Sequence, residues 1–204
     1  MLLRLRKIRR RLEEAYQDIR INYTYANAGV QLRRATDNER RLTIGVRDFI
    51  EAGCSIEFDA QHESWITRIF PDGVFEVKYS YCYEDPSSLA RFLMTTRVEI
   101  AKDSSLALEL FQEGVASWEA GVATVGARFV FKGNLQNWSD SAYCALTLAE
   151  PNETVVGCVM AFQKERLVYS ITLRGLFFEN VEEVECIVYP YLEQALALAR
   201  EEAS

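Results

Sequence analysis

Two groups of ionisable side chains in this 204-residue chain could do acid/base chemistry. The only histidine, His62, stands beside Glu63 in a polar stretch. Two neighbouring acids can act as general acid and base when burial raises the pKa of one of them. The acids of the second group instead fall on the first turn of a predicted helix, where carboxylates stabilise the N-terminal dipole. We therefore predict no catalytic residue and interpret His62 as a solvated loop side chain. The second group consists of Glu179, Glu182, Glu183 and Glu185.

The cysteines show no pattern of a metal or redox site. They are odd in number, far apart and never in a Cys-x-x-Cys spacing, and no pair of histidines could complete a ligand set. A glycine-rich phosphate loop and a Gly-x-Ser-x-Gly elbow are also missing from the sequence. We predict no metal, no cofactor and reduced thiols in a cytoplasmic protein. The five cysteines are Cys54, Cys82, Cys144, Cys158 and Cys186.

Charge divides the chain into a basic head and an acidic body. Residues 1–47 carry 12 Lys/Arg and 5 Asp/Glu, a balance of +7, and residues 48–204 carry 11 and 25, a balance of −14. An acidic body repels nucleic acid, so we expect a protein partner and no nucleic acid. No stretch approaches the roughly 20 apolar residues that a transmembrane helix needs, and we predict no such segment.

The head begins with a predicted amphipathic helix over residues 2–20. Leu5, Ile8 and Leu12 continue into Ala15 and Ile19 at helical spacing, with arginines around them. This stripe predicts packing on the main domain or on a second copy, which would make a homodimer. Two alternatives remain open: binding of an anionic surface, or an Arg-rich peptide that targets an organelle.

Turn-forming residues follow the predicted N-terminal helix. Residues 22–44 are polar and predict a linker, and a short helix over residues 46–52 should end at Gly53. The strong periodic patterns all come later in the chain. We therefore predict two parts, a basic helical extension with its linker over 1–54 and a folded domain over 55–204.

Period-two patterns predict a largely antiparallel sheet in this domain. Six segments qualify, and residues 155–162 are apolar on both faces, as in a central strand covered on both sides. Helical patterns run from Ser104 to about Gly121 and from Val181 onward, where Pro190 should kink the helix. The predicted fold is α+β, a mostly antiparallel sheet covered by helices as an α/β/α sandwich. The strand segments are 75–81, 92–100, 127–131, 143–148, 155–162 and 167–173.

Aromatic side chains supply the predicted binding surface. Phe177 and Phe178 lie in the loop before the last helix, where exposed paired phenylalanines would mark an interface. Tyr83, at the end of an aromatic strand, extends this surface. The interface residues that we predict are Phe177, Phe178 and Tyr83 with Leu5, Ile8 and Leu12 of the N-terminal helix.

The segment Ala161-Phe-Gln-Lys-Glu-Arg-Leu-Val-Tyr-Ser-Ile-Thr-Leu173, with the loop and helix after it, resembles the closing unit of the PsbP-like superfamily. The pattern of residues 92–100 running into a helix at Ser104 resembles the middle of the same fold, so the likeness covers roughly residues 60–200. The resemblance implies a non-enzymatic α/β/α sandwich that binds proteins. Members include extrinsic photosystem subunits, a Ran-binding transport factor and chaperones of secretion effectors.

These observations predict a non-catalytic, protein-binding module of the adaptor or chaperone-like type. One alternative is a peripheral scaffold whose basic N-terminal helix anchors it to an anionic surface or partner. Another is an enzyme with a pocket that no sequence motif reveals.

Overall fold

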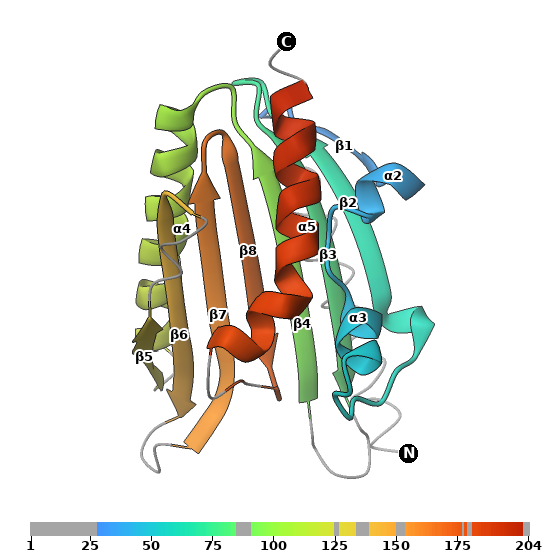
Figure 1. Ribbon diagram of the computed structural model, residues 1–204, viewed down its shortest axis with the longest axis vertical. Helices are drawn as coiled ribbons and strands as arrows, with labels where there is room; N and C mark the ends of the chain where they lie inside the picture. Colours follow the sequence, from blue (N-terminus) through green and yellow to red (C-terminus); the bar gives the residue numbers. More distant parts are fainter. Residues whose placement is uncertain are drawn as a thin grey trace.

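An eight-stranded antiparallel sheet organises the described residues (Figure 1). The computed structural model describes residues 28–84, 91–124, 127–133, 139–149, 154–176, 178 and 181–201. The strand order is β1-β2-β3-β4-β8-β7-β6-β5. Strands β1 and β5 therefore form the two edges of the sheet, and β4 pairs with β8 near its middle.

Two consecutive four-stranded meanders build this sheet. Each strand pairs antiparallel with the next strand of its meander, and the β4–β8 pair joins the two halves. The first meander contains β1 (Gln31–Arg34), β2 (Glu63–Ile69), β3 (Phe75–Glu84) and β4 (Arg91–Ile100), and the second contains β5 (Ala127–Gly133), β6 (Ser141–Ala149), β7 (Thr154–Lys164) and β8 (Leu167–Arg174).

One face of the sheet, called here the inner face, carries the main core. The long helix α5 (Val181–Glu201) and the short helix α3 (Val46–Glu51) pack on it. Their apolar side chains meet those of β3, β4, β7 and β8, which alternate along each strand because side chains of a strand point to opposite faces. Pro190 lies inside α5, and Figure 1 shows that this helix is bent, as the sequence predicted.

The opposite face, the outer face, is covered over only half its width. Helix α4 (Ser104–Thr124) packs on β5 to β8, where Ala107, Leu106 and Leu110 contact Val168 and its neighbours. Asp103 accepts a hydrogen bond from the Leu106 backbone N–H at 2.9 Å and caps the first turn of α4. In the described part of the chain, no helix packs on the outer face over β1 to β3.

The α+β fold with a mostly antiparallel sheet is confirmed. All six predicted strands are present, and β7 is buried on both faces over most of its length, as the apolar run at residues 155–162 predicted. The short helix before Gly53 and the two long helices also lie where we expected them. The predicted N-terminal helix over residues 2–20 falls outside the described residues.

Strands β1 and β2 and the short helix α2 (Asp37–Arg40) were not predicted. Strand β1 has only four residues, all exposed, so burial leaves no period-two pattern in its sequence. Helix α2 begins where Thr36 and Glu39 form a reciprocal capping box, which we had interpreted as a turn.

Residues 30–54 pack on the sheet, which corrects the predicted linker. Ile44, Val46 and Phe49 are fully buried in the main core, together with Ala35 and Leu42. Leu42, Ile44 and Val46 alternate over only five residues, a run too short to predict a strand, and only contact with the sheet reveals them as core. Where an independently folding unit begins stays a prediction.

None of the described helices is long and apolar enough to cross a membrane.

Candidate functional site

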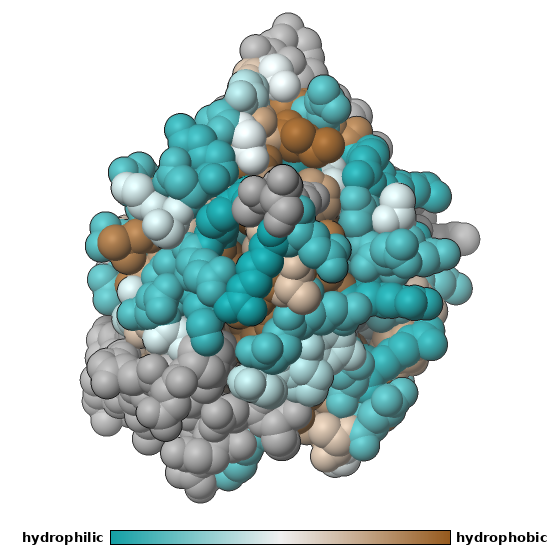
Figure 2. All heavy atoms as spheres, turned by 45° about the horizontal axis from the view of Figure 1, so that its top comes forward, coloured by the Kyte–Doolittle hydropathy of each residue, from teal (hydrophilic) through white to brown (hydrophobic). Residues whose placement is uncertain are grey.

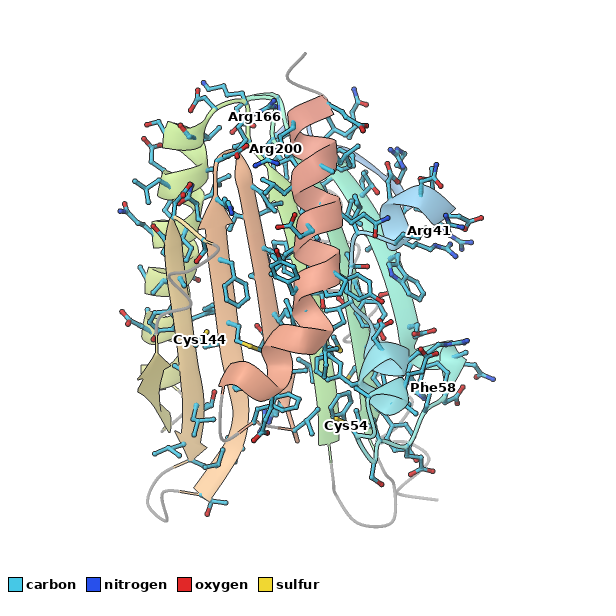
Figure 3. The ribbon with its side chains drawn as sticks, viewed as in Figure 1. Arg41, Cys54, Phe58, Cys144, Arg166 and Arg200 are labelled. Carbon is cyan, nitrogen blue, oxygen red and sulfur yellow. The ribbon has the colours of Figure 1, made fainter. Side chains whose placement is uncertain are left out.

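Five arginines lie on β1, on α2, in the segment that leads into α3 and on α3 itself, and we call this surface the basic corner. They come from 15 consecutive positions of the chain, 33 to 47. The acidic residues in this range are Asp37 and Glu39. Figure 3 shows Arg41 beside α2, with its side chain directed away from the sheet. The basic corner consists of Arg33, Arg34, Arg40, Arg41 and Arg47.

Three of these arginines are held by neighbours. Arg33 forms a bidentate ion pair with Glu39 at 2.5 and 2.7 Å, which lowers the pKa of that carboxyl to about 2. Arg40 lies over the Trp65 ring at 5.2 Å, and Arg47 lies over the Phe58 ring at 4.7 Å. Their positions are therefore set by the fold.

Arg34 and Arg41 differ from the other three. Both are exposed, and no described carboxylate pairs with either of them. An exposed guanidinium with no carboxylate partner attracts anionic groups from solution, most strongly at low salt. The basic corner therefore offers two exposed positive charges to an acidic ligand.

The backbone of β1 offers hydrogen bonds beside these charges. The Ala35 N–H donates to the Trp65 carbonyl of β2 at 3.4 Å. Because backbone groups alternate in direction along a strand, those of Leu32 and Arg34 point away from β2. No described strand pairs with this side of β1. The basic corner thus joins an exposed strand edge to a positive surface.

Buried tyrosines of the sheet fix the segment that carries the basic corner. The hydroxyl of Tyr169 accepts from the Ile44 N–H at 3.0 Å, and the hydroxyl of Tyr79 accepts from the Val46 N–H at 3.1 Å. Tyr79 also donates to a carboxylate oxygen of Glu63 at 3.1 Å. Burial raises the pKa of both phenols, so they stay protonated.

Replacing Tyr169 by Phe should lower the free energy of unfolding by about 1–3 kcal/mol, because the buried Ile44 N–H loses its acceptor. Urea unfolding measures this change. Tyr143→Phe is the matched control: its hydroxyl bonds the exposed Glu119 at 3.3 Å, and its loss should cost less than about 0.5 kcal/mol. Equal effects of the two changes would contradict the assignment.

A second group of charges lies on the outer face, and we call it the charged cluster. Arg68, Glu76 and Glu99 are directly opposite one another on β2, β3 and β4, and Arg97 lies beside them. Glu76 pairs with Arg68 at 2.5 Å and with Arg97 at 3.4 Å, and Glu99 lies 3.9 Å from Arg97. Neighbouring strands thus place two acids and two bases within one ion-pair network.

The fold changes the pKa of Glu99 in the charged cluster. Burial raises its pKa to about 7, in spite of the opposing charge of Arg97. The Glu99 carboxyl binds its proton more tightly in the folded than in the unfolded protein. Its protonation therefore stabilises the fold, fully below pH 4.5, and this stabilisation is lost as the pH rises from 4.5 to 7.

Glu99→Gln should remove that pH dependence. The free energy of unfolding of the variant, minus that of the natural chain, should rise by about 3 kcal/mol between pH 4.5 and pH 8. Chemical denaturation across this pH range measures the difference. The exposed Glu109 on α4 provides the control, since Glu109→Gln should leave the pH profile unchanged. A flat difference for Glu99→Gln would show that Glu99 ionises normally.

The predicted aromatic interface is only partly described. Phe178 is half-buried and lies 5.7 Å from the Phe49 ring, so it belongs largely to the core. Tyr83 is half-buried against the ring of the exposed His62 at 5.7 Å. The structure does not bring Tyr83 and Phe178 together in any described contact. Phe177, Leu5, Ile8 and Leu12 lie outside the described residues.

Exposed apolar side chains are few and scattered on the described surface. The large ones are Leu32 on β1, Leu108 on α4 and Tyr189 on α5. On the face that Figure 2 shows, the described residues are mainly hydrophilic, with separate hydrophobic areas between them. Among the described residues, charge and backbone edges are therefore the more prominent recognition features.

The described residues contain no group of three or more His, Cys, Asp and Glu arranged to hold a metal ion. Cys144 and Cys158 are buried, and burial raises the pKa of each thiol to about 12, which makes them poor nucleophiles. No family model, curated protein or solved structure matches this chain.

Sequence reasoning missed the basic corner because it assigned these residues to a linker. The excess of arginine in residues 1–47 was visible, but we attributed its function to the N-terminal helix. The short spacing of Arg33, Arg34, Arg40 and Arg41 around a capping box was the signal that could have separated them.

Proposed function

We propose that this protein is a non-catalytic binding module, adaptor or chaperone-like in type, that receives an acidic, extended segment of another protein along β1. The observation that carries the proposal is the exposed edge of β1 together with Arg34 and Arg41, two exposed arginines with no described carboxylate partner. The resemblance to the PsbP-like superfamily supports the same class of function.

The β1 edge and the two arginines would contribute differently to recognition. An added strand would bond to the outward backbone groups of Leu32 and to the Arg34 N–H, because the Arg34 carbonyl already accepts from the Arg33 guanidinium at 3.3 Å. Such backbone bonds give affinity with little dependence on sequence. Carboxylates on that strand would pair with Arg34 and Arg41, which gives a preference for acidic segments. Arg33 would contribute less, because Glu39 already neutralises it.

A reducing compartment fits this proposal. None of the four described cysteines forms a disulfide, and two of them are buried as small apolar side chains. We therefore propose a cytoplasmic location.

A labelled eight-residue peptide of alternating Glu and Val tests the proposal by fluorescence anisotropy with the full-length protein. We expect binding that weakens with added salt and falls at least tenfold in the double variant Arg34→Glu/Arg41→Glu. Leu32→Pro should weaken binding similarly, because it removes a backbone donor that points away from β2 and leaves the β1–β2 bonds intact. A peptide with Gln in place of Glu should bind more weakly.

Lys102→Glu is the control variant. Lys102 is exposed after β4 and is not one of the five arginine positions of the basic corner, and its reversal changes the net charge in the same direction. Equal binding by all the variants, or no binding of the acidic peptide by the natural protein, would refute the proposal. Tight binding to anionic lipid vesicles without any binding to the peptide would instead favour the surface-anchored scaffold.

A further inference from the structure

Three of the four members of the charged cluster are buried although no described helix packs on that part of the outer face, while the Arg97 side chain is 39% exposed. The side chains of Arg68, Glu76 and Glu99 are only 9%, 4% and 12% exposed. The helices α3 and α5 lie on the inner face, and α4 packs over β5 to β8. Charged side chains on a bare sheet surface ordinarily remain solvated. Their burial indicates a cover over β2 to β4.

The outer face also presents apolar side chains suited to a cover. Ile66 on β2 and Leu93 on β4 share this face with the charged cluster, since Ile66 is opposite Lys78 and Leu93 is opposite Cys82. Both apolar residues are half-buried. An occupant with one apolar stripe and polar flanks would match such a surface of mixed character.

We propose that residues 2–20 of this same chain lie over the outer face of β2 to β4 as an amphipathic helix. Their stripe of Leu5, Ile8 and Leu12, continued by Ala15 and Ile19, would pack on the apolar residues and shield the charged cluster from water. The proposal goes beyond binding at β1 and does not depend on it.

The length and position of the segment support this occupant. A helix of 19 residues is about 28 Å long, and strands β3 and β4, of ten residues each, extend about 33 Å. The described chain begins at Ala28, just before β1, and β1 lies next to β2. Residues 21–27 would connect the two, because seven extended residues span up to about 25 Å.

Thiol accessibility provides a direct test, because Cys82 lies on the outer face and Cys54 lies outside the sheet. In full-length Ile8→Asp/Leu12→Asp, we expect a maleimide to modify Cys82 at least tenfold faster than in the natural protein. Cys54 should change less than twofold. Mass spectrometry of the digested protein identifies which cysteine has reacted. Circular dichroism first establishes that the variant is folded.

Arg6→Asp/Arg10→Asp is the matched control, because these positions fall opposite the apolar stripe on a helix. It should leave the rate at Cys82 within twofold of the natural protein. An unchanged rate in folded Ile8→Asp/Leu12→Asp would overturn the proposal.

A cross-link in the natural protein covers the case in which that variant does not fold. The chain has a lysine in the segment, Lys7, and one on the outer face, Lys78. A short amine-reactive reagent should join Lys7 to Lys78 in preference to Lys164 at the β7–β8 turn. A mixture of isotopically light and heavy protein should give no light–heavy product. Mixed products would show that a second copy supplies the cover, and a Lys7–Lys164 product alone would also overturn the proposal.

Discussion

Gly157→Ala should destabilise the protein by about 3 kcal/mol or more, the largest effect that we expect of any single methyl group. A Cβ at position 157 would lie 2.1 Å from the carbonyl oxygen of Leu173 and 3.0 Å from the Cα of Arg174. Both atoms belong to the backbone of β8, which neighbours β7, so no side-chain rotation can relieve the contact. Two strands would have to move apart near the middle of the sheet.

The glycine also coincides with an irregularity in strand pairing. The register between β6 and β7 shifts beside Thr147, the partner of Gly157. The Gly175 N–H donates to the Val156 carbonyl at 2.8 Å, which draws the two backbones together at the same place. Glycine is common where a bulge brings one backbone close to another.

Gly114→Ala is the control, because it adds the same methyl group at a position where no atom lies close to it. Gly114 lies within α4, and nothing lies within 4 Å of a Cβ added there. The change should stabilise the protein by about 0.5–1 kcal/mol, because glycine is a poor helix former. Thermal or urea unfolding of the two variants compares them directly, and a Gly157→Ala variant as stable as the natural chain would refute the close approach.

Phe49→Ala should cost about 3–5 kcal/mol of unfolding free energy. The Phe49 side chain is fully buried in the main core and lies 5.7 Å from the Phe178 ring. Its removal would leave a cavity between α3 and Phe178. The change therefore measures how firmly residues 46–51 belong to the core.

Glu51→Ala is the control for Phe49→Ala, since Glu51 is exposed at the end of the same helix. It should change stability by less than about 0.5 kcal/mol. If Phe49→Ala cost under 1 kcal/mol, residues 30–54 would be an appendage, and the boundary predicted near residue 55 would be supported.

Most strands and helices of the fold were predictable from the local spacing of apolar residues. Strands β3, β4, β7 and β8 were predictable because each has seven or more residues and a burial pattern that its own sequence records. Helices α4 and α5 were predictable for the same reason, from stripes at helical spacing. The packing of residues 35–45 on the sheet was not predictable, because their apolar residues form only a short run and the Ile44 N–H is held by the hydroxyl of Tyr169, which lies far along the chain.

The candidate sites were less predictable from the sequence than the fold. The sequence showed the excess of arginine in the first 47 residues, and it showed that catalytic motifs are missing. It could not show that Arg34 and Arg41 remain without a described carboxylate partner while Glu39 neutralises Arg33, because that depends on which side chains the capped turn brings together.

By itself the sequence determined the class of fold, the two long helices and the buried character of β7, because each depends on neighbouring residues and their spacing. Only the tertiary structure decided the rest. Strand register brought Arg68, Glu76 and Glu99 side by side from three strands, and burial then shifted the pKa of Glu99. Such juxtapositions are set by contacts between distant segments, which no local pattern encodes.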